Sequence, residues 1–341
     1  MVVKFCSRLS EQIERTWREW EMKSSFSPFL YFDYMKSIYR QIRFFVWRYN
    51  AVIATVENEN GEILMIAPLK RNVCTRAYKM LGDVRGCGEA DFLFAPEASY
   101  EVRKKCVSLF MEKLGEKIMF RRIFANSCLT KILSELGYIS SVRETPCVKI
   151  CYGDDVEAHV KGLSSSVRQN IRTAYNRMKR DSMAYELKVY IGTNIMDNQV
   201  GRDIMNIYIR RQKLKYSKHK NLMHLPLDFV IRMKYRRILH DSVSLRNDGN
   251  SFHSVLYLNG KAVSFMSGFV DKQAHRVVVP RLAIDSDYGF YSPGYVMILE
   301  TMKRLIEETS IRVIDLSRGD EKYKLDLGGT PYATHMYTCN A

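Results

Sequence analysis

One order of predicted elements occurs twice along this chain of 341 residues, and the repetition limits the folds that it can adopt. In the first half an alternating strand ends at an Asn-Gly pair, a typical tight hairpin turn, and a second strand, a helix and a further strand follow. The second half has the same order around another Asn-Gly pair. The hairpin glycine and the start of the last strand lie 57 residues apart in the first half (Gly61 to Ile118) and 51 in the second (Gly260 to Ile311). Matching order and similar spacing predict a duplicated fold.

The length and composition fit two globular domains. A chain of 341 residues is long for a single core, and a hydrophobic content of 46% is enough for two. The predicted domains cover residues 1–155 and 156–341. Helical and strand patterns are mixed in both, so the predicted fold class is α/β (α+β), with a mixed, mostly antiparallel sheet flanked by helices in each domain.

Three features predict a cytoplasmic protein. The first residues lack the apolar core of a signal peptide, and no run approaches the roughly 20 apolar residues that span a membrane. The eight cysteines include no Cys-x-x-Cys pair. A disulfide framework is therefore not expected, and no metal site is predicted.

Positive charge is concentrated in one segment. The chain has a net charge of +16, and residues 161–240 alone hold 18 Lys and Arg against 5 Asp and Glu, a net of +13. The segment is predicted to be helical, with an apolar stripe that includes Val167 and Ile171. Its charge would attract nucleic acid, anionic membrane surfaces or phosphorylated metabolites, and a solvated basic face is the alternative.

The run Ser292-Pro293-Gly294 begins the helix of the second repeat. A helix start presents unpaired N–H groups and a partial positive charge, which together suit a phosphate. Glycine allows close approach of a ligand, and proline has no N–H to lose in a first turn. The preceding strand contains Pro280, which cannot donate to a ladder and predicts an edge, a bulge or an opening in the sheet. The pattern indicates a slot for an extended ligand with a phosphate; an ordinary capped helix is the alternative.

These features resemble the acyl-CoA site of the GNAT superfamily of N-acyltransferases, in which two splayed strands hold the pantetheine arm and the next helix binds the pyrophosphate. A closer resemblance is to the GNAT-type domain of CelD-like proteins, which are related in architecture to the Fem peptidyltransferases. It is carried by YSPGYVMILE and IDLSRGDEKYK and covers nearly the whole chain. The motif residues are Ser292, Pro293, Gly294, Asp315, Gly319, Asp320, Glu321, Tyr323 and Lys324.

The resemblance implies two tandem GNAT-like domains, with acetyl-CoA or another acyl-CoA as co-substrate. The usual phosphate loop of GNAT proteins, Gln/Arg-x-x-Gly-x-Gly/Ala, is absent, so the prediction depends on Ser-Pro-Gly and Tyr295. In the first half, Glu97 precedes the equivalent helix and would repel a phosphate. The domain 1–155 is therefore predicted not to bind CoA and to be a scaffold or a wall of the acceptor site.

Acyl transfer to an amine needs a base, polarisation of the thioester carbonyl and protonation of the leaving thiolate. The backbone N–H groups of Leu282 and Ala283 could polarise the carbonyl, and Tyr323 occupies the position from which a GNAT tyrosine often protonates the thiolate. Glu321 and Asp320 are candidate bases, of which adjacent positions allow only one to face a cleft. For Tyr323, simple aromatic packing is the alternative.

Further candidates surround this set. Lys324 either contacts an anionic substrate or pairs with a carboxylate, and Asp315 either organises the loop or contacts the acceptor. Arg168 and Arg172 lie one turn apart and could bind an acidic group on the acceptor. Asp91 follows a glycine-rich loop and could bind the acceptor from the first domain, with turn formation as the alternative.

The predicted function is an acyl-CoA-dependent N-acyltransferase, with an N-acetyltransferase of an amino sugar or of an envelope polysaccharide or lipid precursor as its expected form. One alternative is a Fem-like aminoacyltransferase that uses aminoacyl-tRNA, which the basic segment would suit. Fem proteins typically carry a long coiled-coil insertion, whereas the segment 200–240 is short. A non-enzymatic nucleic-acid-binding protein on a degenerate GNAT fold is a further alternative, although no array of interleaved aromatic residues supports it.

Overall fold

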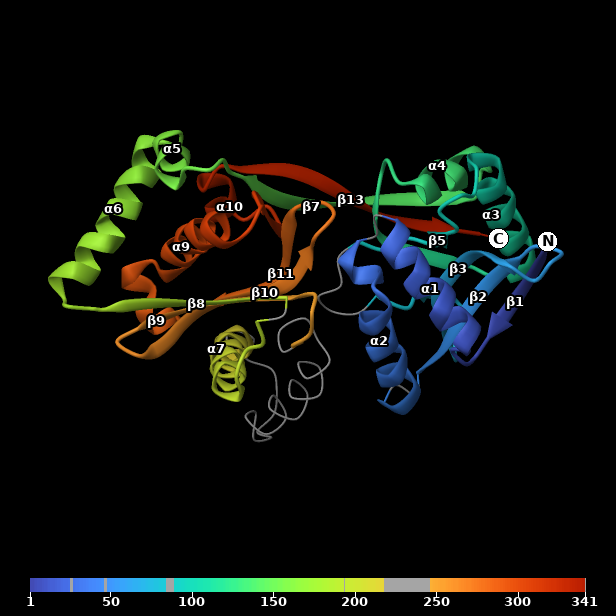
Figure 1. Cartoon of the computed structure of the whole chain (residues 1–341), viewed down its shortest axis with the longest axis horizontal. Helices are drawn as coiled ribbons and strands as arrows, with labels where there is room; N and C mark the ends of the chain where they lie inside the picture. Colours follow the sequence, from blue (N-terminus) through green and yellow to red (C-terminus); the bar gives the residue numbers. More distant parts are fainter. Residues whose placement is uncertain (25–26, 46–47, 84–88, 193, 218–245, 341) are drawn as a thin grey trace. The chain divides into compact units, whose positions relative to one another are not determined.

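The computed structural model describes residues 1–24, 27–45, 48–83, 89–192, 194–217 and 246–340. The chain forms two compact units (Figure 1). Unit 1 comprises Met1–Pro146 and Ala333–Ala341, and unit 2 comprises Cys147–Tyr332. These bounds differ from the predicted halves in two short segments, 147–155 and 333–341, each of which belongs to the unit built mainly from the other half.

Unit 1 is a mixed sheet with helices on it. Its strands follow the order β1-β2-β3-β4-β6-β13, with β5 beside β3. The elements are β1 (Val2–Cys6), α1 (Glu11–Lys23), α2 (Phe32–Phe45), β2 (Tyr49–Glu57), β3 (Ile63–Asn72), β4 (Tyr78–Met80), β5 (Leu93–Phe94), α3 (Tyr100–Leu114), β6 (Ile118–Phe124), α4 (Cys128–Glu135), β7 (Ile139–Cys151) and β13 (Gly329–Cys339), with a short 3-10 turn at Pro28–Leu30.

The local signals of unit 1 explain its elements. The hydroxyl of Ser10 accepts the N–H of Ile13 and starts α1, whose Ile13, Trp17 and Trp20 are buried as the apolar spacing predicts. Gly61 has a φ of 79° in the hairpin turn between β2 and β3. The core of this unit lies between those strands and the helices α3 and α4.

Unit 2 has the strand order β7-β12-β11-β10-β9-β8. Its elements are α5 (Val156–Lys161), α6 (Ser165–Arg180), β8 (Tyr185–Ile191), α7 (Asn198–Ser217), β9 (Ser251–Leu258), β10 (Lys261–Asp271), β11 (Arg276–Ile284), the 3-10 helix η2 (Ser286–Tyr291), α9 (Pro293–Glu308), β12 (Val313–Arg318) and α10 (Lys322–Asp326).

The sheet of unit 2 is covered on both faces (Figure 1). One face packs on α6 and α9, and the predicted stripe of α6, including Val167 and Ile171, is buried there. The other face packs on α7 through Val255, Phe265 and Ala283. Alternate residues of β9 therefore contact opposite helical layers, which is why the strand is buried along its whole length.

The two repeats have a similar order of elements among the described residues, except that the first has two helices, α1 and α2, where the second has α7. The first runs β1, α1, α2, β2, β3, β4, α3, β6, α4, β7, and the second runs β8, α7, β9, β10, β11, α9, β12, α10, β13. Each unit takes an edge strand from the other half of the sequence, because β13 pairs with β6 and β7 pairs with β12. Alternation in the sequence predicts the strands, but it does not say which strand is the partner.

Parts of the predictions fall outside the described residues. These are residues 218–240 of the basic segment and residues 84–88 of the glycine-rich loop. Within the described part of the chain, no helix combines the length and the hydrophobicity needed to cross a bilayer.

Candidate functional site

The sheet of unit 2 opens between β11 and β12. These strands run parallel and pair over three positions, of which the last joins Val278 to Asp315. Beyond that pair, β11 continues to Ile284 in register with β10. The described residues of β12 continue instead alongside β7 as far as Arg318. The two strands thus diverge in the direction of their C-terminal ends.

A bulge coincides with the opening. In the pairing of β10 with β11, Ser267 faces Arg281 and Phe269 faces Val278, so Val279 and Pro280 oppose Gly268 alone. A Cβ atom at position 268 would lie 1.8 Å from the carbonyl oxygen of Val278, so glycine is required there. The bulge that Pro280 predicts is confirmed.

The helix start at Ser292-Pro293-Gly294 is unusual in its capping. Ser292 has φ 48° and ψ 51°, and its hydroxyl caps no N–H of α9, whose first residue is Pro293. The N–H of Gly294 has no hydrogen-bond partner among the described residues. In unit 1 the hydroxyl of Ser99 accepts the N–H of Val102 and caps α3 in the usual way. The second repeat therefore leaves a helix N-terminus open where the first closes it.

This helix start lies at the diverging strands. A Cβ atom on Gly294 would be 3.5 Å from the Ile284 side chain at the end of β11, an ordinary contact, and the φ of Gly294 is not positive. The Ser264 hydroxyl donates to the Pro293 carbonyl at 3.3 Å. On the other side, the Tyr295 hydroxyl donates to Asp326 of α10 at 3.2 Å. The first turn of α9 thus contacts both β11 and the helix that follows β12, and neither packing nor backbone conformation requires a glycine at 294.

The loop after β12 is organised by Lys324. Its ammonium donates to the carbonyl oxygens of Leu316, Arg318 and Gly319 at 3.1, 2.9 and 3.0 Å and pairs with Glu321 at 2.9 Å. The Lys324 side chain is 4% exposed, whereas that of Glu321 is 56% exposed. Of the two sequence alternatives for Lys324, the structure contains the ion pair with a carboxylate.

The carboxylate of Glu321 folds back over the loop. A Cβ atom on Gly319, which has a φ of 99°, would lie 2.4 Å from this carboxylate. Burial alone would raise the pKa of Glu321, but the hydrogen bond and charge of Lys324, with a contribution from Arg211, hold that pKa below its usual value. Glu321 is therefore ionised at neutral pH and is a weak proton acceptor. Asp320 is exposed on the preceding turn.

Tyr323 lies half-buried on α10. Burial raises the pKa of its hydroxyl to about 12, the charge of Glu321 acts in the same direction, and Arg211 opposes both. The phenol keeps its proton throughout the physiological pH range, so it can act as a hydrogen-bond or proton donor.

Asp315 closes the narrow end of the opening. It is 1% exposed, pairs with Arg276 at 3.1 Å, accepts the N–H of Ser317 at 2.8 Å and accepts the hydroxyl of Tyr332 at 2.8 Å. Arg276 also pairs with Asp271 at 3.0 Å. The contacts of Asp315 are those of a loop organiser, one of the two interpretations that the sequence left open.

The remaining predicted positions are spread more widely. On β11, Ala283 is buried against α7, while Leu282 packs on the opposite face of the sheet. Arg168 donates to the carbonyl oxygens of Lys161 and Leu163 and, with Arg172, lines a groove of about 290 Å³ between α5, α6 and α9. Asp91 belongs to unit 1, where its carboxylate accepts the N–H of Phe92 at 2.8 Å and burial raises its pKa to about 7.

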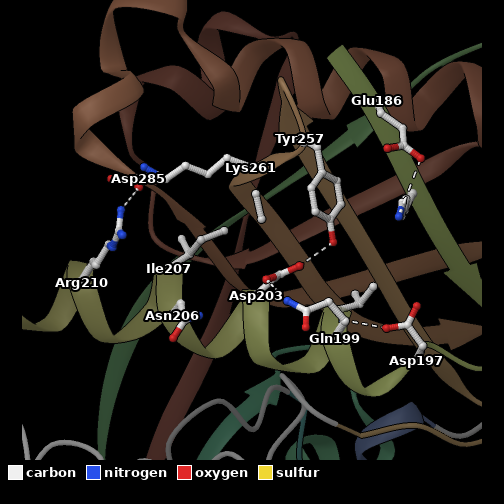
Figure 2. Close-up of a pocket in the computed structure, with 14 residues that line it drawn as sticks. Glu186, Asp197, Gln199, Asp203, Asn206, Ile207, Arg210, Tyr257, Lys261 and Asp285 are labelled. Atoms are coloured by element: carbon white, nitrogen blue, oxygen red, sulfur yellow. Dashed lines mark hydrogen bonds and ion pairs between the residues drawn. The ribbon is translucent and has the colours of Figure 1, made fainter. Parts of the chain in front are cut away.

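Sequence reasoning missed two consecutive arginines of α7. Figure 2 shows Arg210 reaching Asp285, with which it pairs at 2.6 Å, in a polar groove of about 440 Å³. Arg211 donates to the carbonyl of Leu282 on β11. Charge alone could not identify them, because Arg210 and Arg211 are two of 18 basic residues in the segment 161–240. Only the packing of α7 on β11 distinguishes them.

The groove of Figure 2 contains two carboxylates that are already bound by other side chains of the groove. Its carboxylate Asp203 accepts the Tyr257 hydroxyl at 3.0 Å, and Asp285 is held by Arg210. No cluster of three or more metal-ligating side chains occurs in the described ranges of the chain. His253 of β9 is buried with both ring nitrogens hydrogen-bonded, to Ser267 and to the Arg246 carbonyl.

Comparison with known proteins agrees with this architecture. Residues 165–325 match the family model described as acetyltransferase (GNAT) domain. No curated protein matches the sequence.

Solved structures of low sequence identity share the fold. A tandem GNAT protein from the clavulanic acid biosynthesis pathway is 11% identical, with a TM-score of 0.51 over 99% of this chain and 98% of that one. The structure of L-PGS from Bacillus licheniformis is 9% identical, with a TM-score of 0.54 over 96% of this chain and 91% of that one. FemX is 9% identical, with a TM-score of 0.52 over 85% and 88%. The predicted fold class, two tandem GNAT-like domains of mixed sheet and helices, is confirmed, and the fold is that of acyltransferases.

Proposed function

We propose that unit 2 is an acyl-CoA-dependent N-acyltransferase that transfers an acyl group, in the first instance acetyl, to an amine. The observation that carries the proposal is the end of β11–β12 pairing at Val278 and Asp315, beyond which β11 runs on to Ile284 beside a helix start without a side-chain cap. Diverging strands leave backbone groups for the amides of a pantetheine arm, and the open N–H of Gly294 at the positive end of α9 suits a diphosphate. The proposal includes the likeness to CelD-like proteins. It also includes, as the acceptor, the envelope precursor which that likeness implies.

The fit can be argued from Gly294. A glycine that neither its φ nor its neighbours require leaves the backbone accessible, as a bound diphosphate would need. Its N–H has no partner among the described residues, and Ser292 adds a hydroxyl that is not used for capping. In the first repeat the corresponding cap is formed by Ser99, which supports binding in unit 2 alone.

The chemistry then divides among few groups. The amine nitrogen attacks the thioester carbon and forms the C–N bond, and the C–S bond breaks with its electron pair going to sulfur. The nitrogen loses a proton, which restores the Tyr323 hydroxyl after that hydroxyl has protonated sulfur. We assign the proton that sulfur receives to Tyr323, whose hydroxyl remains protonated at neutral pH. The backbone of Leu282 and Ala283 is proposed to polarise the carbonyl.

The other motif residues are given supporting roles. Lys324 and Asp315 use their polar atoms on the loop itself, so we assign them to positioning. Glu321, ionised and exposed beside the opening, is proposed to attract the ammonium form of the acceptor, and Asp320 to lie at its entrance. The lowered pKa of Glu321 makes it a weak base, so the amine is expected to react in its neutral form.

Calorimetric titration with acetyl-CoA tests the proposal. We expect micromolar binding by the wild type, unchanged folding but weaker binding by Gly294→Ala, and loss of binding by Gly294→Glu, whose carboxylate would repel the diphosphate. Ser99→Ala in unit 1 is the matched control and should bind as the wild type does. Failure of the wild type to bind acetyl-CoA would overturn the proposal.

A second candidate is an aminoacyltransferase that uses aminoacyl-tRNA. It is favoured by the groove between α5, α6 and α9, whose rim contains Lys161, Arg168, Arg172 and Lys303 against the single acid Glu157. Titration with tRNA at 50 and 200 mM salt separates the candidates, because phosphate contacts lose affinity steeply over this range. Tight, salt-sensitive tRNA binding without a response to acetyl-CoA would favour it, or a nucleic-acid-binding role without catalysis.

A further inference from the structure

Two neighbouring side chains of α7 contact the free half of β11 and the residue that follows it. Arg210 pairs with Asp285, which is 2% exposed and accepts the N–H of Asp287 at the start of η2. This contact fixes α7 to the segment before α9, and Figure 2 shows its geometry. Arg211 donates instead to the carbonyl of Leu282, two residues beyond Pro280 and therefore within the part of β11 that has left β12.

Arg211 also lies within electrostatic reach of α10. Its charge acts on the hydroxyl of Tyr323 and on the carboxylate of Glu321. Both of these residues follow β12, whereas the Leu282 carbonyl belongs to β11. A single guanidinium from α7 therefore lies at the opening and acts on groups that follow each of the two strands.

The chemistry of arginine suits a negative charge at this position. A guanidinium stays charged at every accessible pH and carries five N–H donors. Leu282 takes one of them in the described structure, and the side chain is exposed at the opening, so donors remain for a ligand. The group in acyl transfer that becomes anionic near Tyr323 is the departing sulfur.

We propose that Arg211 stabilises the thiolate that leaves when the acyl group is transferred. The inference rests on the proposed acyl-CoA site. When the C–S bond breaks, sulfur keeps the electron pair and Arg211 stabilises the resulting charge. The Tyr323 hydroxyl then gives its proton to sulfur and takes up the proton that the nitrogen loses, so that the products are the free thiol and the neutral phenol. The same charge lowers the pKa of the bound CoA thiol below its value of about 8.5 in solution.

The experiment compares two ligands over pH. CoA carries a thiol and acetyl-CoA does not, so calorimetric titration of each from pH 6 to 9.5 isolates the ionisation of sulfur. The wild type should gain affinity for CoA relative to acetyl-CoA as pH rises, by about tenfold for a pKa lowered by one unit. Arg211→Gln should lose most of this gain and keep its affinity for acetyl-CoA, and Arg211→Lys should retain part of it.

Arg202→Gln is the matched control, because Arg202 is an exposed α7 residue that bonds Gln199 of the same helix. Equal pH dependence for the two ligands in the wild type, or an unchanged dependence in Arg211→Gln, overturns the role of Arg211 and leaves the acyl-CoA site intact. Absence of binding by both ligands overturns the proposed function itself. Weaker binding of both ligands by Arg211→Gln at all pH values would indicate an anchoring role for Arg211 and contradict the proposal.

Discussion

At the scale of single residues, Lys324 is a charged side chain that is buried in the protein. Its ammonium satisfies two carbonyl oxygens of β12 and one of the turn after it, and removing it would leave these oxygens and the Glu321 carboxylate without their donor. We expect Lys324→Met to lower the free energy of unfolding by about 3 kcal/mol, measured by urea denaturation. The exposed neighbour in Lys322→Met should lose almost nothing. If the two variants were equally stable, Lys324 would not be needed for stability, and a role in catalysis would be the better explanation of its position.

Asp91 makes the stability of unit 1 depend on pH. Its pKa is about 7 in the folded chain and about 3.9 when unfolded, so the folded state binds the proton more tightly. Its contribution to stability is therefore complete below pH 4 and is lost as pH rises to 7. Three pKa units correspond to about 4 kcal/mol, which is an upper bound.

Asp91→Asn removes this loss, because the amide oxygen can still accept the Phe92 N–H. We expect the variant to be more stable than the wild type at pH 8, with a difference that shrinks toward pH 4, in urea titrations at both values. A difference that does not change with pH would show that Asp91 is charged in the folded protein throughout.

At the scale of elements, the bulge in β11 holds the sheet open. Gly268→Ala would place its methyl group against the backbone of Val278. That backbone can move away only if the pairing of β10 with β11 changes at the bulge. The expected result is a loss of about 1–3 kcal/mol and weaker binding of acetyl-CoA, by denaturation and calorimetry. Gly249→Ala, where an added Cβ has open space, should change neither. Unchanged cofactor binding in Gly268→Ala would separate the bulge from the site.

The same elements show how far sequence patterns reach. Capping and apolar spacing predict α1 and α6, and the proline of a first turn predicts the start of α9. The missing N–H of Pro280 predicts the irregular strand, and all of these signals are local. The burial of Lys324 and the position of Arg211 are not local properties. They arise when α10 folds over its own turn and α7 packs on β11, contacts that charge and periodicity do not encode.

At the scale of the whole molecule, each unit depends on a strand from the other half of the sequence. Tyr337 and Cys339 of β13 are buried in the core of unit 1, where the strand pairs with β6. A chain shortened to residue 332 should therefore lose the order of unit 1 while unit 2 keeps its sheet. Limited proteolysis with mass spectrometry should show new cleavage within residues 1–146. Protection equal to that of the full chain would show that β13 is dispensable there.

The strands that each unit takes from the other half of the sequence also affect the order in which the two units can complete their sheets during synthesis. Residues 333–341 follow Pro146 by almost 190 positions, so the ribosome must translate all of unit 2 before the first unit can finish its sheet. Unit 1, whose synthesis begins first, is consequently the later unit to complete its sheet. Until β13 has been translated, the edge of β6 has no such strand to pair with.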